Sequence, residues 1–135
     1  MAKNALPTLL KLADKALEDI QQKLHLNRLE QQSVQSKIAN WEQEIATAFS
    51  AAIAEDAVRD LQAAHAYQYR AAAAIAELNT TLQALLGTET ELRNALHEAY
   101  TTQQQYKQLL ETQTTRAKLL ANRKTQANLD DLKRR

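Results

Sequence analysis

Apolar residues recur in the N-terminal part of the chain at alternating intervals of three and four positions. The register that they form contains Leu6, Leu10, Ala13, Leu17, Ile20, Leu24, Asn27, Gln31, Val34, Ile38, Trp41, Ile45, Ala48 and Ala52. Only Asn27 and Gln31 interrupt its apolar character. Such spacing aligns side chains along one face of an α-helix, here called the seam, where two helices of a coiled coil pack together. The pattern predicts a helix over about residues 4–50.

A second register with the same spacing follows. It contains Leu61, Ala64, Gln68, Ala71, Ile75, Leu78, Leu82, Leu85, Glu89, Leu92, Leu96, Ala99, Gln103, Tyr106, Leu110, Gln113, Ala117 and Leu120. Four of its eighteen positions are polar, so this seam is less apolar than the first. It predicts a second helix over about residues 56–130.

The two registers do not join into one. Continued past Ala52, the first register misses the second by two residues, which matches neither a three-residue nor a four-residue interruption of a coiled coil. A chain reversal at about residues 50–56 explains the offset, and Asp56 is a residue type that caps helix starts. The sequence predicts an all-α fold for residues 1–135, a single domain formed by a long antiparallel two-helix coiled-coil hairpin.

The expected helices differ in length. At 1.5 Å per residue they would extend about 70 Å and about 110 Å, so the second would overhang the first by roughly 40 Å at its C-terminal end. Asn4 is a suitable N-cap for the first helix, and Pro7 suits its first turn, where a missing N–H does no harm.

Gly87 allows a different interpretation, in which the second helix is interrupted. A break there, followed by a capping box at Thr88 and Glu91, would give a bundle of three helices. The seam nevertheless passes from Leu85 to Leu92 without losing phase, and a loop would preserve the phase by chance about one time in seven. A glycine inside a helix costs only about 1 kcal/mol relative to alanine. The pattern favours a continuous helix, with the bundle as the alternative.

Composition narrows the possible chemistry. One glycine, one proline and no cysteine among 135 residues are too few for the corners of sheet or α/β folds, for a phosphate-binding loop or for thiol chemistry. His25, His65 and His97 have no partner at metal-ligand spacing on a helix. We therefore expect no enzymatic activity, no cofactor and no metal.

No apolar run approaches the roughly 20 residues that span a bilayer, and the N-terminus lacks the apolar stretch of a signal peptide. We therefore expect a cytoplasmic protein without direct membrane insertion.

Charge is concentrated at the C-terminus. Residues 116–135, here called the basic segment, carry seven Lys and Arg against two Asp, whereas residues 55–115 carry four basic and eight acidic side chains. The basic segment is open to three interpretations: a solvated tail, a surface for an acidic protein, or a nucleic-acid site. The segment contains no aromatic residue for base stacking, so nucleic acid is not an expected partner.

A second candidate surface follows the expected turn. Tyr67, Ala71, Ala74 and Leu78 form a stripe at helical spacing. Alanines in a seam normally let two helices approach closely, which is one interpretation. The other is a docking surface, because an aromatic side chain beside small residues commonly anchors a partner.

Three parts of the chain carry a family resemblance. Residues 9–19 are leucine-rich and then acidic, Tyr67, Ala71 and Ile75 are spaced by four, and residues 116–131 run from basic residues to a Leu-Asp-Asp step. Together they resemble the FliJ family, the coiled-coil component of the flagellar type III export apparatus. In this sequence Ala71 stands where the family pattern has a bulkier leucine, and tyrosine stands where phenylalanine is usual.

The resemblance implies a stalk whose paired termini enter the pore of a hexameric type III export ATPase. By position, the ATPase-facing residues would be Leu9, Leu10, Lys11, Arg116, Lys118, Arg123 and Lys124. The export-gate set would be Tyr67, Ala71, Ala74 and Leu78, facing the cytoplasmic domain of a gate membrane protein. Export chaperones are further implied partners, at a location peripheral to the membrane-embedded apparatus. The alternatives are a similar stalk of an injectisome secretion system, a generic structural coiled-coil scaffold, and a basic binder of membrane surfaces or nucleic acid.

Overall fold

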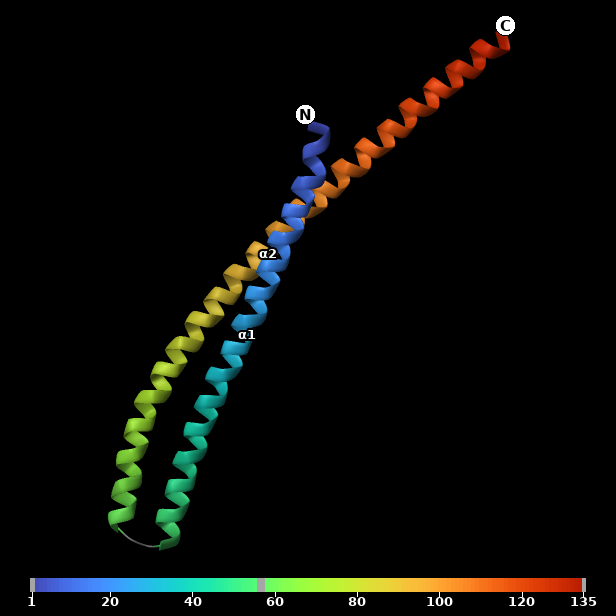
Figure 1. The fold of residues 1–135 in the computed structure, drawn as a ribbon. Coiled ribbons are helices and arrows are strands. Elements are labelled where there is room, and N and C mark those ends of the chain that lie inside the picture. The colour runs from blue at the N-terminus through green and yellow to red at the C-terminus, as the bar shows by residue number, and fades with distance from the viewer. Residues whose placement is uncertain (1, 56–57, 135) are drawn as a thin grey trace. The chain divides into compact units, whose positions relative to one another are not determined.

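The chain forms two long helices joined by a short reversal. The computed structural model describes residues 2–55 and 58–134, with side chains from residue 5 onward. The helices are α1 (Ala2–Glu55) and α2 (Val58–Arg134), and every described residue is helical (Figure 1). This confirms the predicted all-α, antiparallel two-helix hairpin.

The helix ends differ from those expected. α1 ends at Glu55 instead of about residue 50, because the run from Ser50 contains alanines and no helix breaker. Asp56, the expected cap of the second helix, lies outside the described residues. The expected N-cap at Asn4 is wrong, since α1 already begins at Ala2. Pro7 consequently lies inside α1, where its missing N–H deprives the carbonyl four residues earlier of a hydrogen bond.

The structure divides into two compact units. One comprises Met1–Ile20 with Ala95–Arg135, and the other comprises Gln21–Asn94. In the second unit the α1 and α2 segments run side by side in opposite directions (Figure 1). Its most buried apolar residues are Leu24, Val34, Ala52, Ala64 and Ala71. In the first unit Leu6 and Ala13 are the buried apolar residues.

The predicted seam agrees closely with the observed burial. Every residue of the first register is buried or half-buried, and so is every residue of the second register up to Leu110, except Gln68. Tyr67 is half-buried next to the exposed Gln68. The burial of large side chains along the seam is incomplete, because none within the described ranges is completely buried.

The C-terminal part of α2 has no helix covering its seam. In the unit that contains it, the α1 segment up to Ile20 is much shorter than the α2 segment from Ala95. Residues 111–134 are consequently all exposed, including the register positions Gln113, Ala117 and Leu120. This segment of α2, residues 111–134, is called the unpaired segment below.

Gly87 lies inside α2, which continues through it without a break. We expect Gly87→Ala to raise the free energy of unfolding by about 1 kcal/mol, because alanine restricts the unfolded chain and favours helix. A Cβ atom at this position would meet nothing within 4 Å, so no clash opposes the gain. Thermal unfolding followed by circular dichroism measures the effect, and a lowered melting temperature would contradict it.

Candidate functional site

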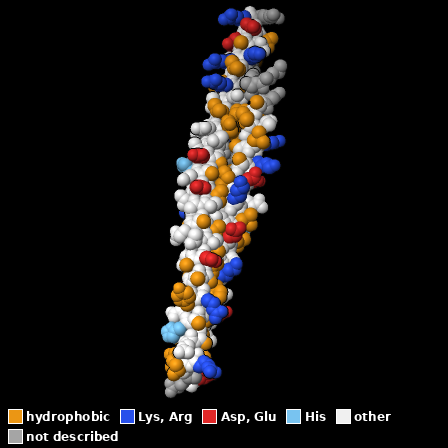
Figure 2. Space-filling model, turned by 90° about the vertical axis from the view of Figure 1, so that its left-hand side faces the viewer, with side chains coloured by type: hydrophobic (Ala, Val, Ile, Leu, Met, Phe, Trp, Pro, Cys, Tyr) orange, Lys and Arg blue, Asp and Glu red, His pale blue; other side chains and the backbone are white. Residues whose placement is uncertain are grey.

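The unpaired segment presents the basic side chains to solvent. Arg116, Lys118, Arg123 and Lys124 are all exposed. Within the ranges that the structure describes, the ion pairs are those of Glu89 with Arg28 and Arg93, so these four cations make none. Figure 2 shows Lys and Arg side chains at the C-terminal end, and others along the rest of the visible face. Their charge is thus available to an acidic surface.

Apolar side chains accompany this charge. Leu119 and Leu120 are 52% and 59% exposed, and Leu129 and Leu132 are also exposed. A shallow hollow on α2 is lined by Leu110, Gln113, Thr114, Arg116, Ala117 and Leu120. Leu110 is the last half-buried residue of the seam register, and Gln113, Ala117 and Leu120 continue that register beyond the covered part of α2. The segment therefore combines an open apolar stripe with flanking positive charge.

The N-terminal residues that the resemblance assigns to the ATPase lie in the same unit as the unpaired segment. Leu9 is 39% exposed, Lys11 is exposed, and Leu10 is half-buried at its seam position. No hydrogen bond or ion pair between described side chains joins Leu9, Leu10 or Lys11 to the basic segment. The two groups therefore share a unit but have no direct polar contact.

The export-gate set lies in the other unit and is only partly accessible. Ala71 is completely buried, at 0% exposure, whereas Tyr67, Ala74 and Leu78 are half-buried. Ala71 thus occupies the seam, as the packing interpretation expects. The exposed aromatic side chain of this region is Tyr69, at 83% exposure, which the spacing argument did not select because it lies outside the stripe.

Tyr67 is held by contacts across the helix pair. Its hydroxyl donates a hydrogen bond to Glu44 Oε2, and its ring lies 5.9 Å from that of Trp41 between centroids. The hydrogen bond to Glu44, with burial second, raises the pKa of Tyr67 above its ordinary value. These contacts fix the ring against α1, where it lines a small hollow with Gln43, Thr47 and Ala48.

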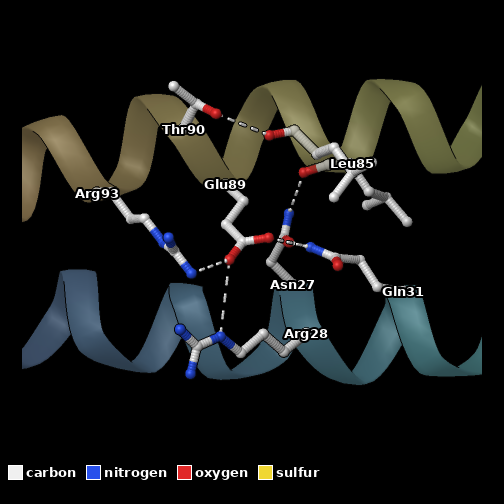
Figure 3. A network of polar contacts seen from close by, with 8 residues as sticks. Asn27, Arg28, Gln31, Leu85, Glu89, Thr90 and Arg93 are labelled. Carbon is white, nitrogen blue, oxygen red and sulfur yellow. Dashed lines mark hydrogen bonds and ion pairs between the residues drawn. The ribbon is translucent and has the colours of Figure 1, made fainter.

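Three of the polar register positions, which the sequence pattern treats only as interruptions, form a network that sequence reasoning missed (Figure 3). Gln31 Nε2 donates to Asn27 Oδ1 at 2.6 Å and to Glu89 Oε2 at 2.7 Å. Asn27 Nδ2 donates to the carbonyl oxygen of Leu85 at 3.1 Å. Asn27, Gln31 and Glu89 are called the polar layer below. The signal was their shared seam face, but periodicity does not tell which residues face one another.

The charge of Glu89 is stabilised where it lies. Its Oε1 atom is 2.7 Å from Arg93 Nη2 and 3.8 Å from Arg28 Nε. The hydrogen bond from Gln31, together with the charges of Arg93 and Arg28, lowers the pKa of Glu89 against the opposing effect of partial burial. The other unit has a simpler counterpart, in which Gln103 Nε2 donates to Asp14 Oδ1 at 2.5 Å.

Neither a metal site nor a membrane span is found in the part of the chain that the structure describes. No group of three or more His, Cys, Asp or Glu side chains there is arranged to hold an ion. No helix among residues 2–55 and 58–134 is long and apolar enough to cross a bilayer.

Comparison with known proteins gives a single finding. The sequence model of a family described as "Flagellar FliJ protein" matches residues 2–135. No curated protein and no solved structure matches the chain. Since the family match extends over nearly the whole length of both helices, the protein belongs to the FliJ family.

Proposed function

We propose that this protein is the stalk of a flagellar type III export apparatus and that its termini enter the ring of a hexameric export ATPase. Membership of the FliJ family makes it a coiled-coil protein related to flagellar export. The proposal adds the partner, the end of the molecule that contacts it, and a cytoplasmic location peripheral to the membrane-embedded apparatus.

The observation that carries the proposal is the unpaired segment. A single helix is about 10–12 Å across, which suits the pore of a ring. Its exposed cations would meet acidic side chains of the pore, while Leu119 and Leu120 would lose exposed apolar area. Leu9, Leu10 and Lys11 would face the ATPase from α1. Exposed ion pairs are individually weak and are screened by salt, so the complex should weaken as ionic strength rises.

The unit formed by Gln21–Asn94 would contact the export gate. Tyr67, Ala74 and Leu78 supply half-buried apolar surface, and Ala71 would act from the seam beneath them by allowing the helices to approach. Export chaperones are proposed as further partners. The function is structural, since the stalk would help assemble the ring or transmit conformational change without chemistry of its own.

Charge neutralisation tests the ATPase assignment. A variant with Arg116, Lys118, Arg123 and Lys124 replaced by glutamine is expected to bind the hexameric ATPase about fourfold to several hundredfold more weakly at low salt, because exposed ion pairs contribute roughly 0.2–1 kcal/mol each. Titration of labelled protein with the ATPase measures the affinity. The same substitution at four other exposed cations, Lys15, Lys23, Lys37 and Arg59, is the matched control.

Two results would contradict the stalk assignment. The first is equal weakening by the four control substitutions, which would indicate a nonspecific effect of net charge. The second is a stable dimer in sedimentation that forms through the unpaired segment, because the surface meant for the ring would then be occupied by a second copy. That result would favour the structural scaffold.

A further inference from the structure

The reversal between the helices does not by itself fix their alignment. No glycine or proline lies between residues 8 and 86, so no such residue confines the turn to one position. The seam next to the turn buries Ala52, Ala64 and Ala71. Residues this small pack similarly against one another after one helix is displaced along the other by a heptad. Another feature of this unit must therefore select the observed register.

The polar layer distinguishes one alignment of the two helices from another, which the alanines do not. Gln31 of α1 and Glu89 of α2 meet at 2.7 Å across the seam. The Glu89 side chain is only 13% exposed, yet it also contacts Arg28 of the opposite helix. The bond from Asn27 to the Leu85 carbonyl is less selective, because a backbone carbonyl is present at every position of α2. Within the polar layer, the contact that depends on alignment is thus the side-chain pair of Gln31 and Glu89.

Displacement by a heptad would separate this pair. If α2 moved so that Leu82 faced Gln31, the carboxylate of Glu89 would face Leu24 instead, because the two helices run antiparallel. If α2 moved the other way, Glu89 would face Ile38. In each case Gln31 and Glu89 would lose their bond to each other and keep only the same-helix contacts with Asn27 and Arg93. The amide and the carboxylate would then face apolar seam residues, which is unfavourable for partly buried polar groups.

From this we infer that the polar layer sets the register of the hairpin formed by Gln21–Asn94. A single polar pair in an apolar seam can fix the register of a coiled coil even where leucines would pack more stably. This role goes beyond the proposed function and does not depend on it, since it concerns alignment within one unit.

The absence of cysteine makes the register directly measurable. Cysteines introduced at the exposed positions Gln22 and Ala73 carry spin labels on opposite helices of the same unit. Dilution with unlabelled protein restricts the measurement to distances within one molecule. The wild-type background should give a single distance distribution.

Relocating the carboxylate provides the sharpest test. Glu89→Leu combined with Leu82→Glu should draw position 82 opposite Gln31 and shift the register by seven residues. Since position 73 then lies closer along the axis to position 22, the axial separation of the labels should shorten by about 10 Å. The matched control exchanges the same residue types at exposed positions, Glu91→Leu with Leu86→Glu, and should leave the distance unchanged.

A second variant covers the possibility that the relocated carboxylate prevents folding. With Asn27, Gln31 and Glu89 all replaced by leucine, we expect a helical protein whose distance distribution divides into several components. A single component at the wild-type distance in this variant would overturn the inference. Loss of helical circular dichroism would also overturn it, because the layer would then supply stability and not alignment. An unchanged distance between the labels in the folded variant with Glu89→Leu and Leu82→Glu would also overturn the inference.

Discussion

Deletion of residues 116–135 is expected to abolish both binding to the hexameric export ATPase and any stimulation of its turnover. The deletion removes all four C-terminal residues assigned to the ring, together with the exposed leucines beyond position 116. The remaining protein should stay folded, because residues 116–134 are entirely exposed and bury no part of the seam. Copurification and ATP hydrolysis, each at low salt, are the measurements.

The thermal stability of the shortened protein is the control for this deletion. The shortened protein should melt at nearly the temperature of the full chain when followed by circular dichroism, so a loss of binding would not reflect unfolding. A matched comparison is the shorter deletion of residues 125–135, which retains all four assigned cations and should preserve most of the binding. Undiminished stimulation by the protein that ends at residue 115 would refute the assignment of the basic segment.

Enlarging the seam at Ala71 is expected to have the largest effect on stability. Ala71→Leu would place a branched side chain where the existing one has no exposed surface. Overpacking of this kind typically lowers the free energy of unfolding by about 1–3 kcal/mol, since neighbouring side chains and the helix axes must shift. The melting temperature should therefore fall by several degrees, measured by thermal denaturation.

Ala72 provides the matched control for Ala71. It is the next residue of α2 and is exposed, so Ala72→Leu adds the same atoms to the outer face and should change stability by no more than about 0.5 kcal/mol. A loss of stability as large at Ala72 as at Ala71 would show that helix propensity, and not seam packing, limits this part of α2. An unchanged Ala71→Leu protein would mean that the helix pair can separate locally without cost.

Much of the fold follows from periodicity, because a residue's place on a helix face depends only on its spacing from its neighbours. Seam positions as different as Leu24 and Asn27 are accordingly both buried. Helix ends are less predictable: the stretch after Ser50 contains good helix formers, and nothing in it marks where α1 stops. The phase argument at Gly87 succeeded because it used residues on both sides of the glycine.

The candidate sites differ in how far the sequence alone predicts them. Exposed charge at Arg116 and its neighbours is readable from the sequence, since charged residues in an unpaired helix remain in solvent. Which residues of α1 face which residues of α2 is not readable, because a 3-4 pattern is unchanged when one helix moves by a heptad. The pairing of Gln31 with Glu89, and the complete burial of Ala71, therefore required the structure.

The incomplete burial along the seam affects the heat-capacity change of unfolding. Since most described residues are exposed and no large side chain among them is wholly removed from water, the average apolar surface exposed per residue on unfolding is small. The heat-capacity change of unfolding depends on that apolar surface and should lie below the roughly 12–15 cal/mol/K per residue of globular domains. The stability curve of this hairpin should consequently be flat, so that its free energy of unfolding varies little over the temperatures at which a cell grows.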